Sequence, residues 1–488
     1  MKLNPAGTAG AFLVGALAVG AFAAGTHFGP AQAAGHNLYQ PVSAAPMHPA
    51  VVLASAGQTA QGGRNDGESI GPDTDSRGST QFLSETSPGA TFAQVYALIE
   101  RNFVDPLPTD RQMAHGAASA MLSSLQDPDS RFLEAPEVAE LNAKSKGVYK
   151  GISAALAVRR TAHAKAGDVP AYTQYSLVVV APLPGSPAEK AGLVAGDTIK
   201  SINGQWIYDD SYIYAQTKAL RAVQDDPVTF NELLSALQKK IDGSLSLSQA
   251  QTKLTDPTLK TITLSVEVGQ LNASRLVPMT LDTSAPTVVS PAVTARSLPG
   301  GIGYLKVAAF TTGADKEFGA ALTGFGNAPK GLVLDLRNSP GGLLEVGTAI
   351  AGKLSSVPTL GYLETKGKKV QSLTVTPDSP LTCPIVVLIN NGTANTAELL
   401  AAALQSKGAK LVGDTTFGDA SDVKLITLRD GSGFTMTVGK LTTAAHGVFG
   451  GVGIKPDVVL PNTNGDAPLD RAVSVLTGRV ARVPASAG

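Results

Sequence analysis

The 488-residue chain lacks an excess of either charge, because Lys plus Arg and Asp plus Glu both number 39. This balance gives no electrostatic case for binding nucleic acid or an acidic membrane surface. A single cysteine, Cys383, excludes an internal disulfide framework, and its place before an apolar run indicates a buried thiol. No Cys/His group has the spacing of a metal site, and no glycine loop has phosphate-binding form. We therefore expect neither a metal nor another cofactor.

Serine is also absent from one informative stretch, since none occurs between Ser379 and Ser406. Within it, the apolar run Pro384–Ile389 leads into the polar bend Asn390–Glu398, and the alanine- and leucine-rich run Leu399–Leu404 follows. This pattern predicts a buried strand that enters a helix through a tight bend. In α/β proteins such bends lie at the carboxyl edge of the sheet, where catalytic groups collect. A nucleophile at this bend would not be a serine.

The first residues have the pattern of an export signal. Lys2 precedes the apolar run Ala11–Ala24, and Ala31-Gln32-Ala33 matches a small-x-small cleavage site. The run is shorter than the ~20 apolar residues of a bilayer span, so a cleaved signal peptide at 1–33 is favoured over a retained membrane anchor. Residues 34–88, rich in Gly, Ala, Ser, Pro and Gln, are predicted to form a disordered linker. We expect a secreted or periplasmic protein.

Helical periodicity follows the linker. Apolar residues at helical spacing predict helices over Thr91–Phe103, Arg111–Leu125 and Pro136–Ala143, with a turn at Asp127–Ser130 between the second and the third. We predict a helical module at residues 89–146.

From Gly147 the apolar pattern changes to a period of two, which predicts strands. The run Pro184–Gly204 holds a short helix that Ser186 caps and Gly192 ends, and it closes on the hairpin signal Asn203-Gly204. This run resembles a PDZ domain. The resemblance implies that the protein captures peptide carboxyl termini by adding a strand to a sheet edge.

The PDZ resemblance covers residues 147–283. It implies a carboxylate-binding loop at Tyr149, Lys150, Gly151 and Ile152. The segment Tyr208–Pro257 is longer than the family needs and is predicted to be an insertion. Either Ser211–Val223 or Phe230–Ile241 could supply the helix of the peptide groove.

Residues 297–463 alternate between strand and helix patterns, which predicts an α/β domain of crossover units. The apolar strand Gly331–Leu336 runs directly into the loop Arg337–Gly342. Strands are also predicted at Lys410–Gly413, Lys424–Thr427 and Thr435–Val438. Residues 464–488 are predicted to be a C-terminal tail.

The segment Asp335–Gly342, Asp-Leu-Arg-Asn-Ser-Pro-Gly-Gly, resembles the Asp-Leu-Arg-x-Asn-Pro-Gly-Gly signature of the carboxyl-terminal processing peptidases, or tail-specific proteases. Four other segments occur in family order: Asp127–Leu133, Pro184–Gly204, Thr416–Gly418 and Gly453–Asp457. The resemblance implies a multidomain α+β protein. Its parts would be an N-terminal helical module, a PDZ domain and an α/β peptidase core of the ClpP/crotonase-like type.

The same resemblance implies a serine nucleophile, a lysine base, a glutamine that places the lysine, and an oxyanion loop. The loop is present as Gly341 and Gly342. The positions that match the nucleophile, the base and the glutamine hold Asn395, Asp419 and Val423. An asparagine amide does not attack a carbonyl at a useful rate. Asn395 with Glu398 instead has the spacing of a helix capping box.

These observations favour a secreted pseudoprotease that binds peptide or protein carboxyl termini through its PDZ domain. Two alternatives remain open. One is an active serine- or threonine-type endopeptidase with a relocated nucleophile, Thr393 or Thr396, and with Asp419, Lys424 or His446 as base or orienting group. The other is an envelope scaffold or adaptor that pairs with an active protease.

Overall fold

The computed structural model describes residues 88–165, 171–256, 258–268, 275–285, 287–288, 291–326, 328–460 and 466–478. The predicted signal peptide and residues 34–87 of the predicted linker lie outside the described residues. The described chain divides into two compact units, the first ending at Ala118 and the second beginning at Ser119.

Two of the three predicted N-terminal helices are α4 (Pro88–Asn102) and α5 (Asp110–Ser123), and neither has a buried residue. The boundary between the compact units falls within α5. The third, α6 (Ala135–Lys144), starts from a capping box between Glu134 and Glu137 and packs on strand β18 (Gly433–Thr443) in the second unit. The helices predicted for residues 89–146 are therefore present, but they do not form one compact module.

The PDZ-like region is built on an antiparallel sheet whose strand order is β3-β4-β5-β7-β8, with β6 (Gln205–Trp206) paired to β5. The strands are β3 (Ala154–His163), β4 (Tyr172–Pro182), β5 (Thr198–Ile202), β7 (Thr261–Val268) and β8 (Arg275–Asp282). The short helix α7 (Pro187–Lys190) begins as predicted, because the Ser186 hydroxyl accepts a hydrogen bond from the Glu189 N–H at 3.0 Å. Strand β3 is the outermost strand on its side and pairs with β4 along its whole length.

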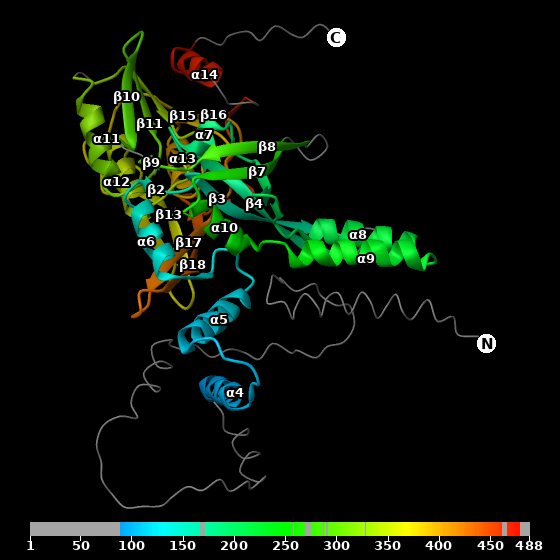
Figure 1. Ribbon diagram of the computed structural model, residues 1–488. Coiled ribbons are helices and arrows are strands. Elements are labelled where there is room, and N and C mark those ends of the chain that lie inside the picture. Colours follow the sequence, from blue (N-terminus) through cyan, green and yellow to red (C-terminus); the bar gives the residue numbers. More distant parts are fainter. Residues whose placement is uncertain are drawn as a thin grey trace, which may run out of the picture. The chain divides into compact units, whose positions relative to one another are not determined.

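The predicted insertion contains three helices. Helices α8 (Asp210–Ala222) and α9 (Pro227–Asp242) form a hairpin with its own apolar cluster, and this hairpin extends away from the PDZ sheet (Figure 1). The third, α10 (Leu247–Thr255), packs into the PDZ core instead. Its Leu254 carbonyl accepts the Ile152 N–H at 3.0 Å. The helix beside the predicted carboxylate loop is thus α10, and the prediction that α8 or α9 fills this place was wrong.

The peptidase-like region has a six-stranded sheet, parallel except for its first strand, in the order β10-β11-β12-β15-β16-β19. Its strands are β10 (Val293–Leu298), β11 (Ile302–Val307), β12 (Gly331–Asp335), β15 (Ile385–Ile389), β16 (Lys410–Gly413) and β19 (Val458–Val459). The central strands β12 and β15 are buried along nearly their whole length, as a sheet covered on both faces requires.

Helices cover both faces of this sheet (Figure 1). On one face α11 (Ala314–Thr323), α12 (Leu344–Leu354) and α13 (Thr396–Ser406) share the largest apolar core. On the other face α14 (Ala467–Leu476) packs on Val333, Val386 and Leu388. The predicted C-terminal tail, 464–488, therefore includes a helix that is part of the core.

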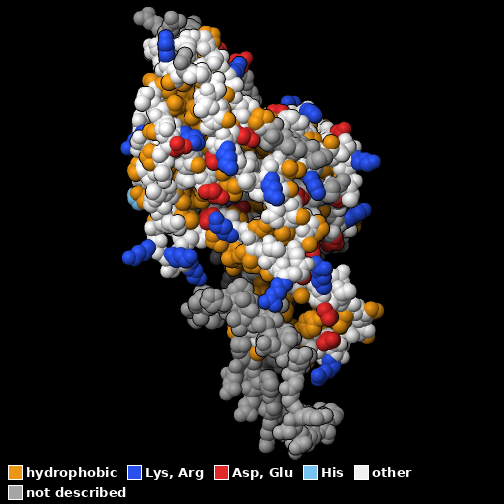
Figure 2. Space-filling view, turned by 90° about the vertical axis from the view of Figure 1, so that its left-hand side faces the viewer, with side chains coloured by type: hydrophobic (Ala, Val, Ile, Leu, Met, Phe, Trp, Pro, Cys, Tyr) orange, Lys and Arg blue, Asp and Glu red, His pale blue; other side chains and the backbone are white. Residues whose placement is uncertain are grey.

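A second sheet lies in the order β1-β18-β13-β14, with β17 (Ser421–Thr427) also paired to β18. Its other strands are β1 (Arg131–Leu133), β13 (Thr359–Thr365) and β14 (Gln371–Thr374), and none of these three was predicted from the sequence. A small ladder joins β2 (Val148–Tyr149) to β9 (Thr287–Val288). On the face drawn in Figure 2, basic and acidic side chains are interspersed, as the balanced composition leads one to expect.

Candidate functional site

The predicted strand–bend–helix lies where the sequence places it, between β15 and α13. Asn395, directly before α13, has a φ of 49° and a ψ of −116°, a conformation that side-chain-bearing residues rarely adopt. Such backbone strain costs of order 1–3 kcal/mol and persists only where the surrounding structure enforces it. The bend is thus held in a strained form although no serine occupies it.

The glycine loop lies directly against this bend. Gly341 has a φ of 86°, and a Cβ added there would meet the Ala394 carbonyl oxygen at 2.7 Å and the Asn395 Cβ at 2.9 Å. Gly342 has a φ of 137°, and a Cβ there would lie 2.5 Å from the Phe310 oxygen. Both positions therefore require glycine. The predicted oxyanion loop and the predicted nucleophile position are neighbours in space.

The side chain of Asn395 is anchored to the segment that carries the predicted base position. Its Nδ2 donates to the Ser421 carbonyl oxygen at 2.9 Å and to Asp419 Oδ2 at 3.3 Å. The structure thus brings Asn395 and Asp419 together. Val423 lies further along β17, where it is 38% exposed and pairs with Thr437.

Glu398, in the first turn of α13, is buried and accepts several hydrogen bonds at this site. Its carboxylate accepts hydrogen bonds from the backbone N–H groups of Asn395 (2.9 Å), Gly418 (2.7 Å) and Asp419 (2.8 Å), and from the Thr416 hydroxyl. Burial raises its pKa to about 7, against these donors, which lower it. The Glu398 half of the predicted capping box is therefore formed, and it also fixes the loop that carries Asp419.

Asp419 is partly buried, and desolvation raises its pKa against the lowering effect of hydrogen bonds from Ser421 and Asn395. The Ser421 N–H donates to Asp419 Oδ1 at 3.0 Å. A further carboxyl group, Asp129, comes from the turn after α5: burial and then the charge of Asp419 raise its pKa to about 6. Asp129 and Ser421 were not among the predicted site residues. The match of Asp127–Leu133 to a family segment was the signal that could have identified Asp129.

The hydroxyl groups of the two alternative nucleophiles, Thr393 and Thr396, form hydrogen bonds to backbone groups. The Thr393 hydroxyl donates to the Leu336 carbonyl at 2.8 Å and accepts from the Asn390 N–H at 3.0 Å. The Thr396 hydroxyl donates to the Gly342 carbonyl at 2.7 Å. Both threonines are fully buried.

The bases proposed for them interact with other residues. The His446 ring stacks on Tyr362, with the ring centroids 3.9 Å apart. Lys424 is largely exposed and pairs with Asp422 at 3.3 Å. The described contacts therefore give no hydroxyl–base pair among the predicted alternatives.

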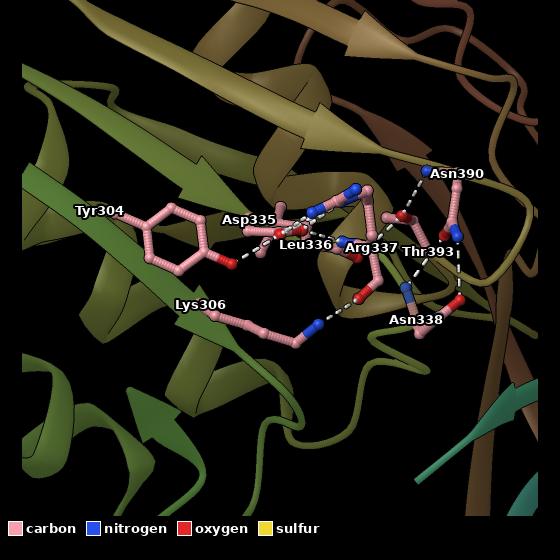
Figure 3. A network of polar contacts seen from close by, with 8 residues as sticks. All are labelled: Tyr304, Lys306, Asp335, Leu336, Arg337, Asn338, Asn390 and Thr393. Atoms are coloured by element: carbon pink, nitrogen blue, oxygen red, sulfur yellow. Dashed lines mark hydrogen bonds and ion pairs between the residues drawn. The ribbon is translucent and has the colours of Figure 1, made fainter. Parts of the chain in front are cut away.

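A polar network holds the glycine loop to the sheet (Figure 3). Asp335 is fully buried and accepts from Arg337 Nη2 at 2.6 Å and from the Tyr304 hydroxyl at 2.8 Å. Burial pushes the pKa of Asp335 up, but the hydrogen bonds of Arg337 and the charges of Lys306 and Arg337 hold it below its ordinary value. The carboxylate therefore stays ionised and fixes the loop that follows β12.

The next residues of the loop join it to the bend. Asn338 accepts from Asn390 Nδ2 at 2.9 Å, and its backbone N–H donates to Asn390 Oδ1 at 2.9 Å (Figure 3). Because Asn338 follows β12 and Asn390 follows β15, this pair ties the carboxyl ends of two neighbouring strands.

The PDZ-like sheet touches the same site. The Arg159 guanidinium of β3 lies over the Phe417 ring, 5.0 Å from its centroid, and burial lowers the pKa of Arg159. A Cβ added at Gly392 would lie 2.8 Å from the Val180 oxygen of β4. The Phe417 N–H in turn donates to the Thr393 oxygen at 2.9 Å. The outermost PDZ strand is therefore next to the bend and to the loop that carries Asp419.

The predicted carboxylate loop is only partly open. Tyr149 and Ile152 are buried, and burial raises the pKa of Tyr149 to about 12. The Ile152 N–H is occupied by the Leu254 carbonyl. A Cβ at Gly151 would overlap that carbonyl at 1.9 Å, which explains the glycine. Lys150 is exposed.

Comparisons with known proteins agree with this architecture. Residues 301–460 match the model of peptidase family S41, and residues 178–222 match that of a PDZ domain. A carboxyl-terminal-processing protease of Synechocystis sp. is 30% identical over 403 residues, which cover 80% of this chain and 82% of that protein. The chain belongs to the carboxyl-terminal processing protease family.

Other members of this family give the same picture. A carboxyl-terminal-processing protease of Picosynechococcus sp. is 30% identical over 388 residues, or 78% of this chain and 81% of that protein. A solved photosystem II D1 C-terminal processing protease has a TM-score of 0.54 and 25% identity, and the match covers 80% of this chain and 91% of that one. The multidomain α+β fold with a PDZ domain and a peptidase core is thus confirmed.

Proposed function

We propose that this family member binds the carboxyl termini of peptides or proteins at strand β3 and does not hydrolyse them by serine–lysine chemistry. The observation that carries the proposal is the state of Asn395. It occupies the strained bend beside Gly341, and its amide is hydrogen-bonded to Asp419 and to the backbone of Ser421.

The chemistry of these groups argues against hydrolysis at the bend. The serine-type peptide hydrolysis of this family needs a hydroxyl nucleophile and a base that takes its proton. The Asn395 amide nitrogen has a delocalised lone pair and acts here as a donor to Asp419 Oδ2. Thr393 and Thr396 donate their hydroxyl protons to backbone carbonyls. In the described contacts, therefore, Asn395 is no nucleophile, and neither Thr393 nor Thr396 donates its proton to a base.

The PDZ sheet supports the binding half of the proposal. Strand β3 pairs with β4 on one side only, so its other edge can accept an extended chain through backbone hydrogen bonds. Helix α10 and the loop at Gly151 stand at the start of β3, where the terminal carboxylate of such a chain would arrive. The Ile152 N–H of this loop now donates to the Leu254 carbonyl, so a bound carboxylate has to replace that carbonyl as its acceptor. A chain bound there also lies close to Phe417, beside the degenerate catalytic positions.

A peptide-binding assay tests this proposal. A short fluorescent peptide with an apolar, free carboxyl terminus is titrated with the purified protein, and the same peptide with an amidated terminus is the matched control. We expect binding of the free acid and at least about tenfold weaker binding of the amide, because hydrogen bonds to a charged group contribute ~1.5–3 kcal/mol. Equal or absent binding of both peptides would contradict the binding half.

Hydrolysis is measured separately, with casein as an unstructured substrate. We expect no cleavage above the rate without protein. Cleavage that is lost in Thr393→Ala or Thr396→Ala would instead establish the relocated-nucleophile alternative.

The N-terminal pattern also supports export of the protein to the periplasm or the medium, which we propose as its location. None of the helices in the described part of the chain is long and apolar enough to cross a bilayer. Cell fractionation with an antibody to the folded region tests the location; recovery in the cytoplasmic fraction would contradict it.

A further inference from the structure

A cavity of about 320 Å³ lies at the edge of the parallel sheet that is opposite the Asn395 bend. It is at the amino ends of strands β15 and β16, where Ile385 and Lys410 are among the residues that line it. Helices α12, α13 and α14 all end there. Because α13 begins directly after Asn395 and its 11 residues rise by about 16 Å, the cavity is separate from the site described above.

Much of the lining of this cavity is apolar. Leu354 of α12, Leu404 of α13 and Val386 of β15 line it and are almost fully buried. Leu381 and Leu476 also line it and are partly exposed. An apolar group bound here is removed from water, and the gain in free energy grows with the apolar area that is buried. The cavity therefore favours a ligand with an apolar body.

The volume limits the size of that body. Ligand pockets in proteins usually have volumes of roughly 300–1,000 Å³, so this cavity is at the lower end of the range. It can hold one unbranched chain of moderate length, but not the two chains of a membrane lipid. A single chain with one polar end is the ligand that this volume favours.

One positive charge at the cavity has no counter-ion. Lys407, directly after α13, lines the cavity, is exposed, and makes no ion pair in the part of the chain that the structure describes. Lys410, the other lysine of the lining, pairs with Asp457 at 3.0 Å. No acidic side chain is among the described residues that line the cavity. The charge of Lys407 therefore favours a ligand whose polar end is negative.

The nearby helix ends do not reverse this preference. The carboxyl end of a helix has a partial negative charge, which its free carbonyl groups carry. Here such carbonyls have donors: the Lys353 oxygen accepts the Leu381 N–H at 3.2 Å, and the Leu404 oxygen accepts the Ala409 N–H at 3.1 Å. These carbonyls are not left open to a cationic ligand, whereas the Lys407 ammonium is available to an anion.

We propose that this cavity binds a free fatty acid of medium length, with the chain against Leu354 and Leu404 and the carboxylate at Lys407. The cavity is separate from strand β3 and from the Asn395–Asp419 pair. The inference therefore does not depend on the proposed function.

The single cysteine of the chain reports on the cavity, because Cys383 is one of the lining residues. Burial raises the pKa of its thiol, so alkylation of the full chain by iodoacetamide is followed at pH 8.5, by mass spectrometry of the intact protein. We expect decanoate at about ten times its dissociation constant to slow the alkylation about tenfold, because only the unoccupied cavity admits the reagent. Octanoate, which is two methylene groups shorter, should bind roughly tenfold more weakly.

Charge and position are then assigned separately. Decanol and decylammonium have the same chain without the carboxylate, and each is expected to protect Cys383 less well than decanoate does. Lys407→Gln should weaken protection by decanoate about threefold, as expected for loss of an exposed ion pair, and leave protection by decanol unchanged. Lys239→Gln, at an exposed lysine of α9, is the matched control and should behave as wild type.

Three results would overturn the fatty-acid site. One is an alkylation rate that decanoate does not change in the wild-type protein, a comparison that needs no variant. Another is protection by decanol or decylammonium that equals or exceeds protection by decanoate. The third is faster alkylation, without any ligand, in a chain that ends at Gly478, which would assign the cavity to residues 479–488 instead.

Discussion

At the residue scale, the proposed site sets a glycine loop beside Asn395 and Asp419, the residues at the positions that we matched to a nucleophile and its base. Asn395 has a strained backbone with a φ of 49° beside Gly341, and strain of this kind clusters at active sites and ligand-binding segments. In the place of a base, Asp419 accepts a hydrogen bond from that side chain. The direction of donation is that of a hydroxyl and its base, but the donor is now an amide, which is not a nucleophile, and the acceptor is a carboxylate.

The retained framework predicts that activity can be rebuilt. The triple variant Asn395→Ser, Asp419→Lys, Val423→Gln restores the three family side chains, but its new lysine would lie beside Asp129. That carboxylate would stabilise the charged lysine and raise its pKa, which makes it a poor base. We expect casein cleavage only when Asp129→Asn is added to the three changes.

Casein cleavage by the triple and the quadruple variants is the measurement, with Asp225→Asn added to the triple variant as the matched control. Equal rates in the triple and quadruple variants would show that Asp129 does not act on position 419.

The glycine loop gives a second prediction at this scale. A Cβ in Gly341→Ala would meet the Ala394 oxygen at 2.7 Å, whereas Gly367→Ala, at a φ of 71°, meets nothing within 4 Å. Both changes add the strain of a positive φ, about 1 kcal/mol, but only the first adds a backbone clash. We expect Gly341→Ala to lower the free energy of unfolding by about 2 kcal/mol more than Gly367→Ala.

Urea denaturation of the two variants measures this difference. An equal decrease in the free energy of unfolding in both variants would mean that the glycine loop moves to accept the new Cβ and does not constrain the bend at Asn395.

At the element scale, the PDZ insertion consists of two parts with different roles. Helix α10 belongs to the PDZ core, while α8 and α9 share a separate cluster. The hairpin also leaves and rejoins the domain at one point, since the Tyr208 N–H donates to the Leu245 oxygen at 2.9 Å. It is therefore an appendage that a short connection can replace.

We predict that replacing residues 210–243 by a short Gly-Ser linker leaves the PDZ domain folded and its peptide affinity within about threefold of wild type. A linker across so short a span has a low closure entropy. Thermal unfolding and the fluorescent-peptide titration check this. A tenfold loss of peptide affinity in a variant that still folds would instead show that the α8–α9 hairpin forms part of the peptide-binding groove.

The elements also show what could be predicted from sequence. Strand β15, the bend and α13 were predictable because an apolar run, a glycine turn and a helical run are local patterns. Strands β13 and β14 were missed, because their burial depends on pairing with β18 and not on a local alternation. Helix α14 was taken for tail, although its apolar side contacts the sheet.

The same division applies to the site: its local motifs could be read from the sequence, whereas contacts between distant segments could not. Motif spacing identified Asn395, Asp419 and the glycine loop, since each lies in a recognisable segment. Asp129 and Ser421 could not be joined to them, because no local pattern reports a contact between the turn after α5 and the start of β17.

At the scale of the whole molecule, the PDZ and peptidase regions meet beside the Asn395–Asp419 pair through Arg159 and Phe417, and the charge of Asp419 acts on Asp129 in the turn after α5. Three regions of the chain therefore contribute to one place, and only the peptidase region carries the family signature there.

The ladder between β1 and β18 has a consequence for the order of assembly. It pairs Arg131 with Thr435, so a strand near the N-terminal end of the described chain cannot pair until a strand close to the C-terminal end has been made. Contacts across such sequence separations are slow to form, and until they do the edges of the strands stay unpaired. A nascent chain therefore cannot complete this ladder until almost all of it has been synthesised, which favours completion of the fold after release from the ribosome.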